Sequence, residues 1–124
     1  MPDRLEDVVR GFAQACLRGD AAAVRAALDA DVVAVCDSGG NVPAAMGTVH
    51  GAEDVADLVA VLLGGPGTEL TVESVNGRAG LAVRRGRSTH AVIGVEEVCA
   101  RVTSLWIVLN PAKLHRWHRP PTAP

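Results

Sequence analysis

Apolar residues near the start of the chain recur at the interval of three to four positions that lines one face of a helix. The residues on this face are Leu5, Val8, Val9, Phe12 and Cys16. We expect Gly19 to end this helix and Asp20 to cap a second one over residues 21–28. The same spacing over residues 52–63 predicts a third helix.

A different pattern, short runs of β-branched and apolar residues separated by glycine and asparagine, predicts strands. The expected strands are residues 31–37, 68–75, 81–85, 89–96 and 101–109. We expect a loop from Ser38 to His50 and a turn at Asn76 and Gly77. The pattern therefore predicts an α+β fold in which three N-terminal helices pack on a curled antiparallel sheet and leave a conical cavity between the layers.

The chain is interpreted as one domain, residues 1–114, followed by a basic, proline-rich tail over residues 115–124. His115 and His118 have the spacing of a helical metal pair, but no carboxylate or cysteine accompanies them. We therefore expect a solvated tail and no metal site. The fixed positive charges near this end are Lys113, Arg116 and Arg119. They could contact an acidic partner or a phosphate group, or belong to a frayed terminus.

Composition limits the class of protein. Apolar residues make up 48% of the chain, charged residues 21%, and the net charge is −2. These values exclude a disordered chain and disfavour a strongly basic nucleic-acid binder. We expect no sequence-specific nucleic-acid binding, and no membrane association because no apolar run approaches the ~20 residues of a membrane span. The three cysteines form neither a disulfide framework nor a metal pattern. A cytoplasmic protein with reduced thiols and no cofactor is expected.

Three short phrases and the order of the elements carry a resemblance to a known superfamily. The phrases are Arg18-Gly19-Asp20, Asp31-Val32-Val33 and His50-Gly51-Ala52-Glu53. They resemble the SnoaL-like and ketosteroid isomerase-like branch of the nuclear transport factor 2 superfamily, over residues 3 to about 114. The resemblance implies the conical, cystatin-like fold of that superfamily, which hosts isomerases, cyclases, dehydratases and binding modules.

The resemblance to steroid isomerases implies a general base at the end of the first strand, a position that Asp37 holds here. Their oxygen-holding donors, a tyrosine on the first helix and an acid on a late strand, correspond to Phe12 and Gly94, which have no side-chain donor. Losing one such donor costs about 10²–10³ in rate, so isomerase chemistry is not expected to survive. The alternative role for Asp37 is to cap the turn that begins at Ser38.

His90 is a second candidate for acid–base chemistry. Strand alternation places His90 and Gly94 on one face of the sheet, which we expect Leu81 and Val83 to share. Histidine shuttles protons near neutral pH, so His90 could pair with Asp37, and a packing or surface role is the alternative. The residues expected to line the pocket are Phe12, Asp37, Leu81, Val83, His90, Leu105 and Ile107.

Trp106 alternates away from the residues expected in the pocket, which predicts that it lies on the outer face of the sheet with Val102 and Val108. An apolar outer face on so small a sheet needs cover. We expect a second copy of the chain to cover it, and the resemblance implies the same because this superfamily commonly forms dimers through its sheets. The alternative is a tail that folds back and places Trp117 near Trp106.

Three further phrases resemble the SnoaL-like extension of certain extracytoplasmic-function sigma factors. They cover residues 37–42, 75–81 and 109–114. The chain departs from the usual phrases at Ser38, Asn41 and Ala112. In those relatives the domain follows two sigma domains and modulates them, which implies a regulatory role and contact with a sigma factor or RNA polymerase. No sigma domain precedes residue 1, so we expect a stand-alone relative or an excised portion.

The expected function is a small-molecule-binding or regulatory module, a homodimer with a small apolar ligand, related to domains that modulate sigma-factor-dependent transcription. The alternative is a small enzyme, an isomerase, polyketide cyclase or hydrolase, that uses Asp37 as general base with His90 as its partner.

Overall fold

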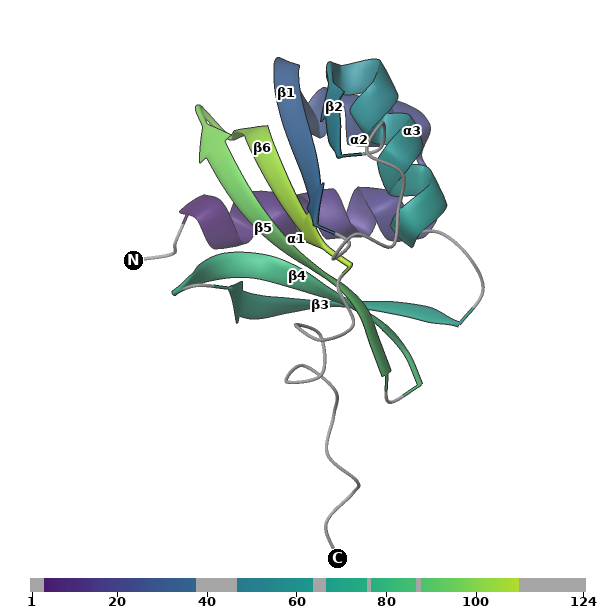
Figure 1. Cartoon of the computed structure of the whole chain (residues 1–124). Helices are drawn as coiled ribbons and strands as arrows, with labels where there is room; N and C mark the ends of the chain where they lie inside the picture. Colours follow the sequence, from purple (N-terminus) through teal and green to yellow (C-terminus); the bar gives the residue numbers. More distant parts are fainter. Residues whose placement is uncertain (1–3, 38–46, 64–66, 76, 87, 110–124) are drawn as a thin grey trace, which may run out of the picture.

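The computed structural model describes residues 4–37, 47–63, 67–75, 77–86 and 88–109. Within them the chain forms three helices and six strands (Figure 1). The helices are α1 (Arg4–Arg18), α2 (Ala21–Ala27) and α3 (Ala52–Leu63). The strands are β1 (Leu28–Asp37), β2 (Thr48–His50), β3 (Thr68–Val75), β4 (Arg78–Arg85), β5 (Ser88–Val98) and β6 (Arg101–Val108). The predicted helices and the five predicted strands are confirmed, with shifts at several ends, and β2 is an addition inside the expected loop.

Gly19 and Asp20 form the turn that separates α1 from α2, as the sequence predicts. Gly19 follows α1 with a φ of 66°, a left-handed conformation that glycine adopts without steric cost. The Asp20 carboxylate accepts a hydrogen bond of 3.1 Å from the backbone N–H of Ala23 and so caps α2. These two residues turn the chain sharply enough for α2 to pack against α1.

The sheet is mixed rather than antiparallel. Its strand order is β2-β1-β6-β5-β4-β3, and β1 runs parallel to β6 while the other neighbouring pairs are antiparallel. The antiparallel prediction holds for the meander from β3 to β6, where short turns force each strand to reverse. It is wrong for β1, because the helix α3 and the meander lie between β1 and β6 and let the two strands run in the same direction.

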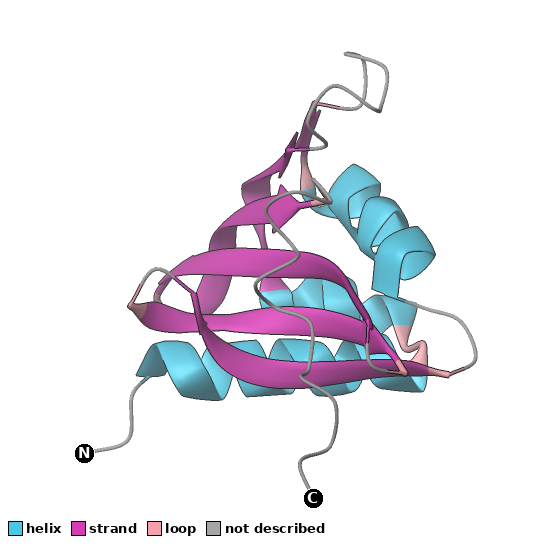
Figure 2. Cartoon of the chain, turned by 60° about the horizontal axis from the view of Figure 1, so that its bottom comes forward, coloured by secondary structure: helices cyan, strands magenta, loops and turns pink. Residues whose placement is uncertain are grey.

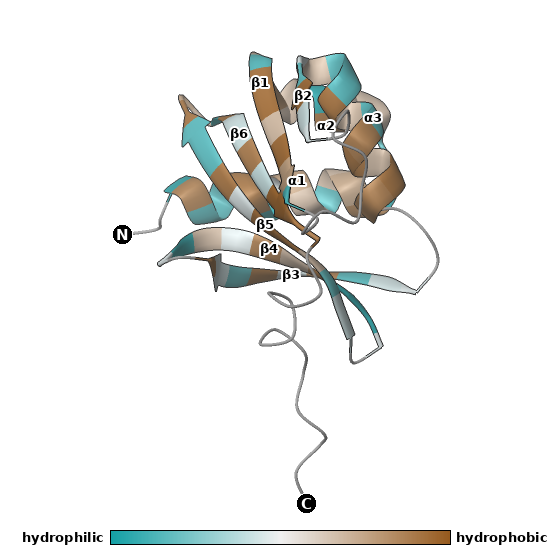
Figure 3. Ribbon diagram, viewed as in Figure 1, coloured by the Kyte–Doolittle hydropathy of each residue, from teal (hydrophilic) through white to brown (hydrophobic). Residues whose placement is uncertain are grey.

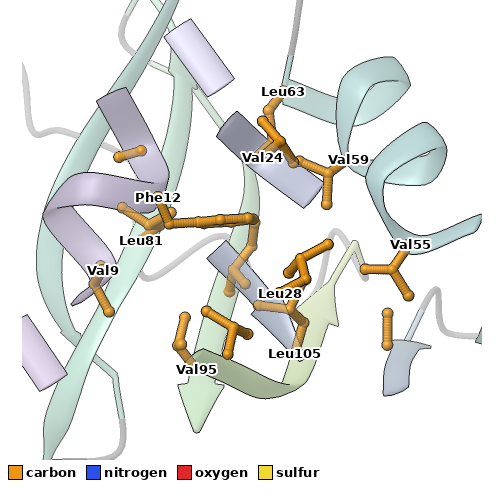
Figure 4. Close-up of a cluster of buried hydrophobic side chains, with 14 of the residues drawn as sticks. Val9, Phe12, Val24, Leu28, Val55, Val59, Leu63, Leu81, Val95 and Leu105 are labelled. Carbon is orange, nitrogen blue, oxygen red and sulfur yellow. The ribbon is translucent and has the colours of Figure 1, made fainter. Parts of the chain in front are cut away.

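Helices cover one face of this curled sheet. The helix α1 lies along the strands, as Figure 2 shows, and α3 flanks β1 and β2. Between helices and sheet lies one cluster of buried side chains, part of which appears in Figure 4. Full burial of each larger apolar side chain contributes roughly 1.5–3 kcal/mol. The conical cavity stays a prediction.

The opposite face of the sheet, called here the outer face, carries a smaller apolar cluster of Val75, Val92 and Val108. Beside this cluster, Val35 and Trp106 are opposite each other on β1 and β6 and are 40% and 38% exposed. Figure 3 shows hydrophobic residues recurring along β1, β5 and β6, with hydrophilic residues between them on β5 and β6. The sheet therefore separates a buried apolar layer from an outer face of mixed character.

Candidate functional site

Five of the seven residues expected to line a pocket lie together between helices and sheet. They are Phe12, Leu81, Val83, Leu105 and Ile107. Each is at most 1% exposed, and all belong to the same apolar cluster. Figure 4 shows the side chain of Phe12 extending from α1 into this cluster. These side chains pack on one another, and their role as ligand contacts stays a prediction.

Asp37 lies at the last position of β1, where it pairs with Val108 of β6. Val108 belongs to the outer cluster, whereas the preceding pair, Cys36 and Ile107, belongs to the helix-side layer. Paired residues share a face, so register assigns the half-buried Asp37 to the outer face, across the sheet from Phe12. The backbone carbonyl of Asp37 accepts a 2.7 Å hydrogen bond from Leu109 N–H. Its role as a base stays a prediction.

Gly94 does not share a face with Leu81, and this part of the sequence interpretation is wrong. Leu81 pairs with Ile93, while Gly94 pairs with Gly80 and with Trp106. The two predicted isomerase-like positions, Phe12 and Gly94, are thus on opposite faces of the sheet. The physical reason is the register of β4 and β5: Leu81 pairs with Ile93 and not with Gly94, and a difference of one residue exchanges the faces.

His90 is exposed and falls at a register shift. Val83 pairs with Ala91, and the next residue of β4 pairs with Thr89, so His90 is the additional residue of a bulge. Val83 belongs to the helix-side cluster, whereas Val92 and Gly94 lie on the outer face, so the expected common face for Gly94 and Val83 is wrong. The bulge interrupts the alternation at His90 itself. The catalytic role of His90 stays a prediction.

The prediction for the outer face is confirmed for Trp106 and Val108 but is wrong for Val102. Trp106 and Val108 lie on the outer face as expected. Val102 is fully buried in the helix-side layer and pairs with Leu28, so its assignment to the outer face is wrong. The physical reason is a register shift beside Ser104, which places one additional residue in β6 and reverses the faces beyond it.

A shallow groove of about 140 Å³ lies on the outer face beside Trp106. Its walls include Val75, Arg78, Gly94, Glu96, Ser104 and Trp106. Farther along the sheet, the Arg84 side chain is nearly buried and donates to Thr71 Oγ1 and, over 3.2 Å, to Glu73 Oε2. Neither feature was predicted. The alternation of charged and apolar residues in residues 69–85 is the signal that could have pointed to them.

Burial shifts the acidity of two thiols. It raises the pKa of Cys16 from 9.0 to about 12 and also raises the pKa of Cys36, because a thiolate loses solvation inside the protein. Both are therefore protonated and unreactive at neutral pH.

Among the described residues, no group of three or more His, Cys, Asp or Glu side chains could hold a metal ion. His115, His118 and the rest of the basic tail lie outside those residues, so the predictions made for them stay predictions.

No helix in the described segments is long and apolar enough to cross a membrane. A curled sheet with helices on one face is the architecture expected from the sequence resemblance. A scan against models of known protein families finds no match, and a search of curated proteins finds none either. Similar folds are found among solved structures.

The extracytoplasmic function sigma factor SigJ of Mycobacterium tuberculosis is similar over 92% of this chain, with 25% identity and a TM-score of 0.69. This chain spans 45% of the length of SigJ. An LEH-like epoxide hydrolase of M. tuberculosis matches 91% of this chain and 87% of its own, with 18% identity and a TM-score of 0.56. An NTF-2-like protein of unknown function from Burkholderia xenovorans LB400 matches 95% of both chains, with 14% identity and a TM-score of 0.61.

The chain therefore has a SnoaL-like, nuclear transport factor 2-like fold. Its structural neighbours include part of a sigma factor and an epoxide hydrolase, so the fold alone does not choose between regulation and catalysis.

Proposed function

We propose that this chain is a regulatory module that acts by binding, with a sigma factor or a sigma-containing RNA polymerase as its partner. The observation that carries the proposal is the similarity to SigJ, which extends over 92% of this chain at 25% identity. The match covers 45% of SigJ, so this chain corresponds to one part of that protein. The phrases at residues 37–42, 75–81 and 109–114, which resemble the SnoaL-like extension of such sigma factors, support the same partner.

The arrangement of the candidate catalytic residues supports binding over catalysis. A general base acts within hydrogen-bond reach of its substrate and of the groups that stabilise the developing charge. Phe12 lies in the apolar layer under the helices, whereas the register of Asp37 and Gly94 assigns both to the outer face. Phe12 and Gly94 also lack the side-chain donors that would hold an oxyanion.

Homodimer formation through the outer face is part of the same proposal. Val35 and Trp106 are neighbours on this face, and each leaves more than a third of its surface exposed. Covering such a pair removes apolar surface from water, which favours association. A small apolar ligand, for which the layer around Phe12 is the expected location, completes the proposed regulatory module.

The test is run-off transcription by RNA polymerase reconstituted with each sigma factor of the source organism in turn, with and without the purified chain. We expect the output of at least one sigma factor to change by about threefold or more at saturating chain, with direct binding of that factor measured by calorimetry. If no sigma factor binds the chain and no output changes, the proposal is wrong.

Asp37→Asn separates the module from the enzyme alternative. The substitution removes the negative charge, and hence the proposed base, but keeps the size of the side chain. We expect sigma binding and the transcription effect to stay within twofold, as for the control Asp31→Asn, which changes an exposed aspartate of the same strand. Turnover of a steroid-like, polyketide-like or epoxide substrate that Asp37→Asn abolishes and Asp31→Asn retains would establish the enzyme instead.

A further inference from the structure

A cavity of about 120 Å³ opens where the end of α1 meets α2 and α3. Its deepest walls are apolar and buried: Val24 is 6%, Ala56 5% and Val59 1% exposed. Figure 4 shows Val24 of α2 beside Val59 of α3. Space remains between these helices because the residues that face one another, Ala56 and Ala60 among them, are too small to fill it.

The size of the cavity limits the ligand to a single ring. An engineered apolar cavity of about 150 Å³ holds benzene, whereas drug-sized pockets measure about 300–1,000 Å³. At about 120 Å³ and open on one side, this cavity accepts one flat ring with small substituents that extend to the mouth. Steroid-sized molecules are too large for it.

Two opposite charges on facing helices lie at the cavity. Arg25 comes from α2 and Asp57 from α3, and both are exposed. Across the segments that the structure describes, no ion pair or side-chain hydrogen bond involves either residue. A guanidinium binds a carboxylate through two parallel hydrogen bonds, and a carboxylate such as Asp57 accepts from a hydroxyl or amino group.

Cys16 contributes the third kind of contact. Cys16 of α1 lines the cavity, and burial raises the pKa of its thiol to about 12. The thiol therefore stays protonated at neutral pH and does not attack a ligand. A protonated, partly buried cysteine behaves as a small apolar side chain, so Cys16 extends the apolar wall against which a ring can pack.

We propose that this cavity between α1, α2 and α3 is a binding site for a small aromatic acid whose ring also carries a hydrogen-bond donor, the hydroxybenzoate and aminobenzoate class. The ring lies between Val24 and Val59, the carboxylate pairs with Arg25, and the ring donor bonds to Asp57. The apolar walls of the cavity, Val24, Ala56 and Val59, belong to the same buried cluster as Phe12, and the cavity opens at the end of that cluster where the three helices meet. The site lies away from the outer face, and it does not depend on the proposed function.

The experiment is a titration of the ¹⁵N-labelled full chain with the three aminobenzoate isomers, benzoate and aniline, followed by backbone amide shifts. We expect at least one aminobenzoate to bind saturably, with shifts concentrated in residues 16–25 and 56–60. Benzoate, which lacks the donor, and aniline, which lacks the carboxylate, should each bind at least about fivefold more weakly.

Paired variants locate the site. Arg25→Gln should weaken aminobenzoate binding about tenfold or more, because a charge-assisted hydrogen bond is lost, and Arg18→Gln, an exposed arginine outside the cavity, should stay within twofold. Ala60→Leu, which places a larger side chain in the cavity, should weaken it similarly, and the exposed control Ala22→Leu should not. No saturable binding at 10 mM ligand, or binding that Arg25→Gln and Ala60→Leu leave unchanged, overturns the proposal.

Discussion

Gly80 and Gly94 face each other on β4 and β5, yet the structure predicts opposite effects when each is replaced by alanine. A Cβ at Gly80 would lie 2.5 Å from the carbonyl oxygen of Ile93 and 2.6 Å from Val75 Cγ2. A Cβ at Gly94 would lie 3.7 Å from its nearest neighbour, a ring carbon of Trp106, which is ordinary van der Waals contact. Neither glycine has a positive φ, so backbone strain does not contribute to the difference.

The magnitudes follow from these distances. Forcing an additional methyl group into a packed site costs about 1–3 kcal/mol, and at Gly80 the obstructing atom is backbone within a hydrogen-bonded pair of strands. Replacing glycine by alanine in a strand otherwise gains roughly 0.5–1 kcal/mol. We therefore expect Gly80→Ala to lower the free energy of unfolding by about 1–2 kcal/mol, and Gly94→Ala to raise it by up to about 1 kcal/mol.

Urea unfolding followed by far-ultraviolet circular dichroism measures both variants without depending on the indole of Trp106. The dependence of free energy on urea should be equal in all proteins, so that a change of midpoint reports stability alone. In the Val75→Ala background, which lacks the obstructing methyl groups, the loss caused by Gly80→Ala should be smaller than in the native background, with the clash against Ile93 remaining. Equal stability of Gly80→Ala and Gly94→Ala would refute this reasoning and the β4–β5 register from which it comes.

Two further predictions concern the buried thiol and the outer face. In the folded chain the Cys16 thiol keeps its proton up to about pH 12, whereas in the unfolded chain it loses the proton near pH 9.0. The free energy of unfolding should therefore fall as the pH rises from 9 to 11, by up to about 1 kcal/mol per pH unit. Urea unfolding at pH 8 and pH 10.5 should show a smaller fall in Cys16→Ala than in the control Cys99→Ser, an exposed cysteine; equal falls would contradict the burial of the thiol. Trp106→Glu should convert a dimer of twice 12.8 kDa into a monomer by light scattering, whereas Val61→Glu on α3 should not; a monomeric native chain would show that the dimer prediction is wrong.

Local signals predicted the helices well. The helix from Ala52 to Leu63 and the strand from Thr68 to Val75 have the bounds expected from periodicity, and Asp20 caps α2 as expected. These features depend on neighbours within a few residues, which the sequence shows directly. The parallel pairing of β1 with β6 depends on contacts between distant segments, and no local pattern encodes strand direction.

The candidate site was harder to predict, because most of its residues lie on strands and each assignment requires knowing which face of the sheet the residue is on. Alternation gives the correct faces for Leu105, Trp106 and Ile107, which lie in a regular stretch of β6. It fails for Val102, where one additional residue reverses the faces, and at His90, where a bulge interrupts the pairing. A single sequence carries little trace of a bulge. It does not show the register between strands either, which is why alternation alone does not reveal that Gly94 and Leu81 lie on opposite faces.

The same dependence on register decides what Asp37 can do. The resemblance assigns it the position of a base, and that position has chemical meaning only where the carboxylate meets an apolar cavity that raises its basicity. The pairing of Asp37 with Val108 orients it with the outer cluster, while the apolar layer begins at its neighbour Cys36. A cysteine whose pKa is raised by burial thus occupies the helix-side position next to the retained acid. One residue of register separates the position of Asp37 from the helix-side apolar layer. Asp37→Asn distinguishes the proposed binding module from the enzyme alternative, because only the enzyme requires the negative charge.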